Sequence, residues 1–178
     1  MKKKIVILGG GESGVGTAIL AKQKGYEVLV SDFGKIKETY KKVLTDFDIV
    51  WEEGGHSEAS ILEATVVMKS PGIPDTAPIV KTIVAHGIPV ISEIEFASRY
   101  TEATLIGITG SNGKTTTTAL LGYILEQAEV NVGIAGNIGD SFAKMVAQQS
   151  IDTYVLEISS FQLDGVVDFA PHIAIITN

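Results

Sequence analysis

The chain has 178 residues, of which 45% are hydrophobic and 20% charged, and it carries a net charge of −7 without any cysteine. This composition predicts folded domains with a real hydrophobic core and no disulfides or cysteine-ligated metals, and the acidic balance excludes a broad nucleic-acid-binding face. Because no apolar run approaches the ~18 residues of a membrane-spanning helix, we expect a cytoplasmic protein with neither nucleic acid nor membrane as a partner.

Short apolar runs alternate with helical patterns along the whole chain, which is typical of βαβ units around a parallel sheet. The predicted strands are residues 4–8, 27–30, 49–51, 65–68, 89–91, 105–108, 131–134, 154–158 and 172–176. Apolar residues at three- and four-residue spacing predict helices over residues 17–24, 36–44, 78–86, 114–127 and 141–148. The fold class expected from this alternation is α/β.

The charges divide the chain into two unequal parts. Residues 1–99 carry 12 basic and 13 acidic side chains, whereas residues 100–178 carry 2 basic and 8 acidic ones. A polar stretch at residues 98–102 precedes a new strand, so we expect a first domain over residues 1–99 and a second over residues 100–178. The chain stops at Asn178 directly after an apolar run, and we expect a fragment whose exposed sheet edge could form dimer contacts.

A glycine-rich loop follows the first predicted strand. Residues 9–14 read Gly-Gly-Gly-Glu-Ser-Gly and match the pattern G-x-G-x-x-G, with Asp32 at the end of the next strand. Glycines at these positions let the backbone approach a pyrophosphate at the start of a helix. The pattern predicts a Rossmann-like nucleotide-binding domain, and a plain strand-to-helix turn is the alternative.

A second loop, over residues 107–116, also joins a strand to a helix. It ends in Gly113-Lys114-Thr115, like a P-loop, although the first glycine of that pattern is replaced by Ile108. Lys114 is one of two basic residues in an acidic segment, so phosphates must be held by local groups: the loop amides, the helix start, the Lys114 ammonium and a Mg²⁺ ion on Thr115. Glu157, at the end of a later strand, is the carboxylate best placed for that ion, with a solvated strand-end residue as the alternative.

Three segments together resemble one family, the Mur ligases of peptidoglycan synthesis. Residues 109–116 resemble the P-loop of the whole superfamily, residues 157–163 (Glu-Ile-Ser-Ser-Phe-Gln-Leu) resemble a signature of the members that add D-glutamate, and residues 70–74 (Ser-Pro-Gly-Ile-Pro) form the third segment. The resemblance implies a Rossmann-like parallel-sheet domain followed by part of a P-loop ATPase-type α/β domain. It also implies ATP and Mg²⁺ as cofactors, with UDP-N-acetylmuramoyl-L-alanine and D-glutamate as substrates joined through an acyl phosphate.

The resemblance also implies roles for individual residues. Lys114 would be the catalytic residue that neutralises the β,γ-phosphates, and Thr115 and Glu157 would hold Mg²⁺. ATP would be bound by Gly110, Ser111, Asn112, Gly113, Lys114, Thr115 and Thr116. The UDP-linked substrate would be bound by Gly11, Glu12, Ser13, Gly14, Asp32, Ser70, Pro71, Gly72, Asn137 and Ser159.

The chain also departs from the family pattern. The family commonly has a polar or basic residue after Asp32, where this chain has Phe33 and Gly34. The family's metal-binding histidine, its carbamylated lysine and its C-terminal domain have no counterpart within residues 1–178. We therefore expect that this chain alone does not catalyse ligation.

Two other functions are compatible with the loops. One is an oxidoreductase domain that binds NAD on residues 9–14 with Asp32 on the ribose, and the other is a non-catalytic nucleotide-binding regulator. The three histidines, His56, His86 and His172, have no metal-ligand spacing, and we interpret them as surface or core residues.

Overall fold

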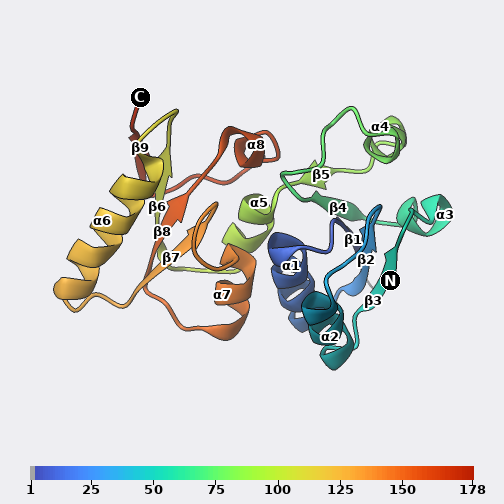
Figure 1. The fold of residues 1–178 in the computed structure, drawn as a ribbon, viewed down its shortest axis with the longest axis horizontal. Coiled ribbons are helices and arrows are strands. Elements are labelled where there is room, and N and C mark those ends of the chain that lie inside the picture. Colours follow the sequence, from blue (N-terminus) through green and yellow to red (C-terminus); the bar gives the residue numbers. More distant parts are fainter. Residues whose placement is uncertain (1–2) are drawn as a thin grey trace.

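The structure is a computed structural model that describes residues 3–178; Met1 and Lys2, which belong to the first expected domain, lie outside the described residues. It contains two sheets, ordered β3-β2-β1-β4-β5 and β7-β8-β6-β9, in which every paired strand is parallel (Figure 1). The strands are β1 (Lys4–Leu8), β2 (Glu27–Asp32), β3 (Val50–Glu53), β4 (Val66–Lys69), β5 (Val90–Ile91), β6 (Thr104–Thr109), β7 (Val132–Gly136), β8 (Thr153–Glu157) and β9 (Ile173–Ile176). The first sheet has a Rossmann-like order, and the predicted α/β class is confirmed.

All nine predicted strands are present; the bounds of β1 are confirmed, and the ends of the other strands differ from the expected ones by at most two residues. The helices are α1 (Glu12–Gln23), α2 (Glu38–Asp46), α3 (Glu58–Ile61), α4 (Pro78–Ala85), α5 (Glu93–Ser98), α6 (Lys114–Gln127), α7 (Phe142–Gln148) and α8 (Ser160–Leu163). The predicted bounds of α6 are confirmed, and those of α4 and α7 differ by one residue at one end.

The predicted starts of α1 and α2 were wrong. Helix α1 begins at Glu12 rather than Thr17, because close packing overrides the low helix propensity of Gly14 and Gly16. Helix α2 begins at Glu38, since Ile36 is buried and its side chain fills the space beside Gly10 instead of continuing a helical face.

Three short helices, α3, α5 and α8, were not predicted. Two of them begin with a capping pattern that the sequence contains. The hydroxyl of Ser92 accepts a hydrogen bond from the amide of Glu95 at the start of α5, and Ser159 and Gln162 form a capping box at the start of α8. These helices are too short for an apolar periodicity to be detected. The capping residues were the sequence feature that could have indicated α5 and α8.

Helices α1, α5 and α7 lie between the two sheets (Figure 1). Helix α1 packs against α7 so closely that a Cβ atom on Gly16 would lie 1.9 Å from the Ser141 hydroxyl oxygen. One hydrophobic cluster includes Ile7 and Ile19 of the first half (residues 1–99) together with Phe142 and Tyr154 of the second half (residues 100–178). The two halves therefore share a continuous core.

Two glutamates of α5 hold this arrangement. Glu93 accepts hydrogen bonds from the Ser141 hydroxyl and from the Ala143 amide, the latter at 3.1 Å. Burial raises the pKa of Glu93, and its second oxygen, Oε2, has no partner among the described residues. The first half of the chain thus contacts the start of α7 through a fully buried carboxyl group.

Glu95 is also fully buried, but both of its carboxylate oxygens accept hydrogen bonds. Its Oε2 accepts three hydrogen bonds of 2.9 Å from the amides of residues 167–169, and its Oε1 accepts two from Arg99, at 2.9 and 2.7 Å. Burial alone would raise the pKa of Glu95, but these donors hold that pKa below its usual value. Glu95 therefore attaches the segment before β9 to α5.

The second sheet has β7 and β9 as its edges, and Ile173 and Ile176 of β9 are exposed. The expected edge-strand dimer stays a prediction. Among residues 3–178, we find no helix with the length and apolar character needed to cross a membrane.

Candidate functional site

The second glycine loop lies between β6 and α6. Gly110 and Gly113 have positive φ angles of 139° and 82°, and Gly113 is the residue before the first helical turn. Within the described part of the chain, no side chain caps α6. The amides of its first turn are therefore free to bind an anion, and the helix dipole favours negative charge there.

Lys114 lies directly over this loop. Its ammonium group donates hydrogen bonds to the carbonyl oxygens of Gly110, at 2.8 Å, and Ser111, at 3.4 Å. The other basic residue of this half, Lys144, instead pairs with Asp140 at 3.3 Å and Glu12 at 3.5 Å. The positive charge at the loop thus comes from Lys114.

Glu157 contacts one residue predicted to bind ATP and one residue predicted to bind the UDP-linked substrate. Its Oε2 accepts a hydrogen bond of 2.8 Å from the Thr115 hydroxyl, and its Oε1 accepts one of 2.6 Å from the Asn137 side-chain amide. The side chain is buried, and the Asn137 backbone amide also donates to the Glu157 carbonyl at 2.8 Å. A carboxylate beside a hydroxyl at the start of a helix is a donor set that suits Mg²⁺.

Sequence reasoning missed two residues that contact the loop. The Asn178 carbonyl and side-chain oxygens accept hydrogen bonds from the amides of Ser111, at 2.6 Å, and Asn112, at 3.0 Å. The Thr177 hydroxyl donates to the Asn112 carbonyl at 2.6 Å. The available signal was the predicted strand that ends directly before them, since parallel pairing of β6 with β9 brings the carboxyl ends of both strands to the same edge.

The backbone of the first glycine loop is closely packed, while its predicted approach to a pyrophosphate stays a prediction. Gly9 has a φ of 98°, and a Cβ atom on Gly14 would lie 1.9 Å from the Gly9 carbonyl oxygen, so only glycine fits there. The Asp32 carboxylate braces this loop by accepting hydrogen bonds from the amides of Gly10, at 2.7 Å, and Gly34, at 2.8 Å.

The other predicted residues of this loop differ in their surroundings. Gly11 is exposed, with no neighbouring atom within 4 Å of an added Cβ. The Glu12 carboxylate accepts a hydrogen bond of 2.8 Å from the Tyr40 hydroxyl, which is the main cause of a raised pKa of Tyr40. The Ser13 carbonyl accepts one of 2.8 Å from the Thr17 hydroxyl.

A cavity of about 660 Å³ lies between the two halves of the chain. Its lining includes Pro71 and Gly72, from the loop after β4, and Asn137 and Ser159 of the second half. Residues 11–14 are not among the residues that line it. The structure thus brings together predicted substrate residues from both halves, while the first glycine loop lies outside this cavity.

Ser70 and Ser159 differ in their hydrogen bonding. The Ser159 hydroxyl donates to Gln162 at 3.0 Å. The Ser70 hydroxyl is buried beside Gly9 and has no partner among the described residues. An unpaired buried hydroxyl is costly, so Ser70 is a candidate for contact with a ligand.

Two family models match the chain. A model of the MurD N-terminal domain matches residues 4–78, and a model of the Mur ligase middle domain matches residues 108–178. A UDP-N-acetylmuramoylalanine–D-glutamate ligase of Christiangramia forsetii is 61% identical over 178 residues, which are 100% of this chain and 40% of that protein. A ligase of the same name from Bacteroides thetaiotaomicron is 57% identical over 99% of this chain and 40% of that protein. The chain thus spans about 40% of the length of the curated relatives it matches.

Solved structures of two other ligases are similar to this fold. The UDP-N-acetylmuramate:L-alanyl-gamma-D-glutamyl-meso-diaminopimelate ligase from Neisseria meningitides has a TM-score of 0.58 and 27% identity, over 88% of this chain and 52% of that chain. The UDP-N-acetylmuramate-alanine ligase from Thermotoga maritima has a TM-score of 0.61 and 22% identity, over 98% of this chain and 41% of that chain. From the two domain models and the sequence identities, we conclude that the chain belongs to the Mur ligase family.

Proposed function

We propose that this chain is the nucleotide-binding part of a cytoplasmic ATP-dependent ligase that joins D-glutamate to UDP-N-acetylmuramoyl-L-alanine. Residues 1–99 are the domain that binds the UDP-linked substrate, and residues 100–178 belong to the domain that binds ATP. The relatives named for this reaction, at 61% and 57% identity, support the proposal.

The observation that carries the proposal is the pair of hydrogen bonds on Glu157. They connect Thr115, at the phosphate-binding loop, to Asn137, which lines the cavity between the two halves. A carboxylate shared in this way supports a reaction in which a phosphoryl group passes from a nucleotide on one side to a substrate on the other. Such transfer depends mainly on positioning and charge neutralisation.

Each group of the site has a separate task. The amides at the start of α6 and the Lys114 ammonium bind the β,γ-phosphates, and Thr115 and Glu157 provide oxygen ligands for Mg²⁺. The metal ion, when bound, neutralises charge on the phosphates. Asn137 orients the muramoyl end of the substrate, whose carboxylate receives the phosphoryl group before the D-glutamate amine displaces phosphate.

The test uses the full-length protein with ATP, Mg²⁺, UDP-N-acetylmuramoyl-L-alanine and D-glutamate. Phosphate release that requires all four components is the expected result. ATP binding without affinity for the UDP-linked substrate would favour a regulator, and tight NADH binding would favour an oxidoreductase. Residues 1–178 alone should release no phosphate in the same assay, and turnover by that fragment would contradict this expectation.

A further inference from the structure

The loop between β6 and α6 contains the only asparagine of this chain that is followed by glycine, Asn112-Gly113. In such a pair, the backbone nitrogen of the glycine can attack the side-chain amide carbon of the asparagine, because the glycine has no side chain to obstruct the approach. Asparagine is accordingly among the thermolabile residues. The surroundings of the pair in the fold decide whether this reaction is suppressed or favoured.

The side chain of Asn112 is free to take part in the reaction. Asn112 is exposed, and its side-chain amide forms no hydrogen bond within residues 3–178. By contrast, the side-chain amides of Asn131 and Asn137 donate to a backbone carbonyl, at 2.8 Å, and to the Glu157 carboxylate, at 2.6 Å. The fold therefore fixes the side chains of Asn131 and Asn137 but leaves that of Asn112 unfixed.

The attacking nitrogen is accessible as well. In the part of the chain that the structure describes, the backbone amide of Gly113 donates no hydrogen bond. A Cβ atom added to Gly113 would have only the Thr177 Cβ within 4 Å, at 3.8 Å, so the space around this glycine is open. The cyclic imide that the attack produces would find room there.

Thr177 is placed to stabilise the charge that the attack creates. When the Gly113 nitrogen loses its proton, the negative charge is shared with the Asn112 carbonyl oxygen through the peptide bond. The C-terminal end of the described chain lies beside this loop (Figure 1), and the Thr177 hydroxyl donates a hydrogen bond of 2.6 Å to that oxygen. Hydrogen bonds to a charged oxygen are stronger than those to a neutral one. The hydroxyl therefore favours the attack.

A competing acceptor does not remove this hydroxyl from Asn112. The Thr109 carbonyl oxygen also lies within reach of the Thr177 hydroxyl, at 3.1 Å, but it already accepts a hydrogen bond of 2.9 Å from the Thr177 backbone amide. The shorter contact, at 2.6 Å, is the one to Asn112.

We propose that Asn112 is a site of spontaneous deamidation and that the Thr177 hydroxyl raises the rate of this reaction. The Gly113 nitrogen forms a bond to Cγ of Asn112, and the side-chain NH2 leaves as ammonia together with the proton from that nitrogen. Water then opens the cyclic imide at either of its two carbonyl groups. The product carries aspartate or isoaspartate in place of Asn112.

The reaction itself is independent of ligation, but its effect on nucleotide binding rests on the proposed function. The product has a new carboxylate in the loop assigned to the ATP phosphates, and isoaspartate also lengthens the backbone. Because like charges repel, we expect the deamidated protein to bind ATP at least about tenfold more weakly. Bound ATP should in turn slow deamidation, since its phosphates would occupy the Gly113 amide.

The experiment incubates the full-length protein at neutral pH and follows the peptide that contains Asn112 by mass spectrometry, which detects the replacement of NH2 by OH. We expect Thr177→Val to slow the reaction by about threefold to tenfold, which corresponds to one lost hydrogen bond. Thr177→Ser keeps the hydroxyl and should retain the wild-type rate. Peptides that contain Asn131 or Asn137 should stay unmodified over the same time.

Thr65→Val is the matched control. The Thr65 hydroxyl also donates to a backbone carbonyl, that of Lys4 at 2.8 Å, but it does so in the first sheet. This variant should deamidate at the wild-type rate. The comparison is repeated in urea, where the Thr177 hydroxyl is no longer held on the loop, and wild type and Thr177→Val should then react equally.

The outcomes separate this inference from the proposed function. A folded wild type that keeps Asn112 intact, or equal rates for folded wild type and Thr177→Val, would overturn the inference. A difference that persists in urea would also overturn it, because the effect would then not come from the folded contact. Deamidation that Mg²⁺–ATP does not slow would contradict the assignment of the loop to ATP, while the effect of Thr177 would stand.

Discussion

Thr115 and Glu157, which are 42 residues apart in the sequence, are joined by a hydrogen bond of 2.8 Å from the threonine hydroxyl to the carboxylate. Strands β6 and β8 are parallel neighbours, so the helix start after β6 and the last residue of β8 meet at the same edge of the sheet. The same carboxylate also accepts the side-chain amide of Asn137. Substitutions at this edge therefore test the proposed nucleotide site.

Glu157→Gln should weaken binding of Mg²⁺–ATP by at least about tenfold in the full-length protein, because it removes the negative charge of the proposed metal ligand but keeps the side-chain shape. Binding measured by calorimetry with Mg²⁺ present tests this. The control is ATP binding in EDTA, which the substitution should not weaken. Equal Mg²⁺ dependence in both proteins would exclude Glu157 as a ligand.

Lys114→Ala should lower turnover by about 10²–10³-fold, by analogy with the loss of one group that stabilises charge in the transition state. Lys144→Ala is the matched control, since it removes the other basic residue of the acidic half, which pairs with Asp140 and Glu12 instead of the loop. A steady-state phosphate-release assay measures both. Similar losses in the two variants would indicate a general effect of charge rather than a local one.

Glu95→Gln should lower the free energy of unfolding by about 2–3 kcal/mol at pH 7, because hydrogen bonds to a charged group are lost. The folded pKa of Glu95 is lowered, so its stabilising effect is complete above the unfolded pKa of about 4.3 and is lost as pH falls through the folded value. Urea unfolding across this range should show the difference from wild type shrinking in acid. A difference that stays constant with pH would contradict the assigned role of the charge.

Glu93→Gln should have the opposite pH dependence. Because burial raises the folded pKa of Glu93, the wild-type contribution is complete below the unfolded pKa and is lost as pH rises through the folded value. Glutamine resembles the protonated form, so the variant should match wild type near pH 4 and become the more stable protein as pH rises. Urea unfolding at several pH values measures this, and a variant that loses stability relative to wild type at higher pH would refute it.

Gly16→Ala should destabilise the protein by about 1–3 kcal/mol, because the added methyl group would overlap the Ser141 hydroxyl where α1 meets α7. In an exposed helix the same change is stabilising, so the sign of the effect tests the contact. Gly34→Ala is the control, since its added Cβ would meet only the Asp32 carboxylate, at 3.4 Å. Thermal melting of both variants provides the measurement, and a higher melting temperature for Gly16→Ala would show that the helices do not meet in this way.

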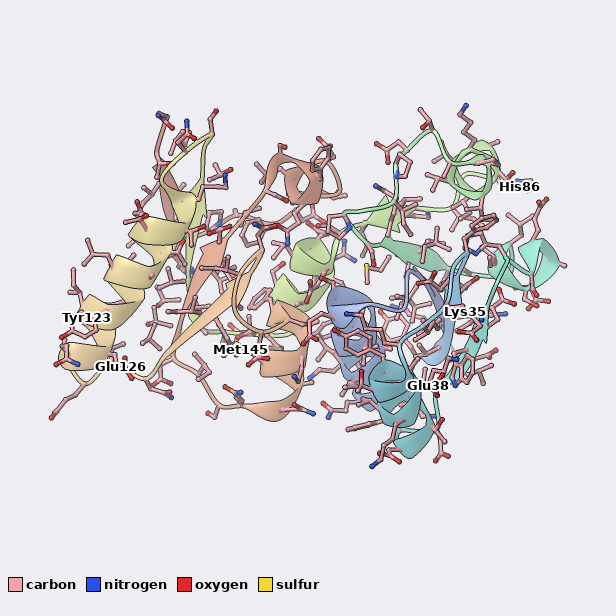
Figure 2. All side chains as sticks on the ribbon, in the orientation of Figure 1. Lys35, Glu38, His86, Tyr123, Glu126 and Met145 are labelled. Carbon is pink, nitrogen blue, oxygen red and sulfur yellow. The ribbon has the colours of Figure 1, made fainter. Side chains whose placement is uncertain are left out.

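Much of the fold could be predicted because alternating strands and helices have clear periodicities, as the bounds of α6 illustrate. The start of α1 could not, since Gly14 and Gly16 are poor helix formers whose positions depend on contacts with distant residues. The exposed side chains on α6, such as Tyr123 and Glu126, fit its simple helical pattern (Figure 2).

In the candidate site, too, some residues could be predicted from local sequence and others depend on distant contacts. Sequence motifs indicated Lys114, Thr115 and Glu157 because each lies at the end of a predicted strand or the start of a helix. They did not indicate that His56, in the loop after β3, is hydrogen-bonded to Ser31 of β2, whose hydroxyl also donates to the Glu52 carboxylate. Such a chain of hydrogen bonds leaves no local pattern, so three-dimensional positions were required to find it.

The close contact between α1 and α7 constrains how hybrids of related ligases can be built. A boundary near Tyr100 would separate Gly16 from Ser141 and Glu93 from its hydroxyl donor, so that helices from different parents would face each other. Recombination at that linker should therefore produce soluble hybrids only when both parents have small residues at the positions of Gly16 and Ser141.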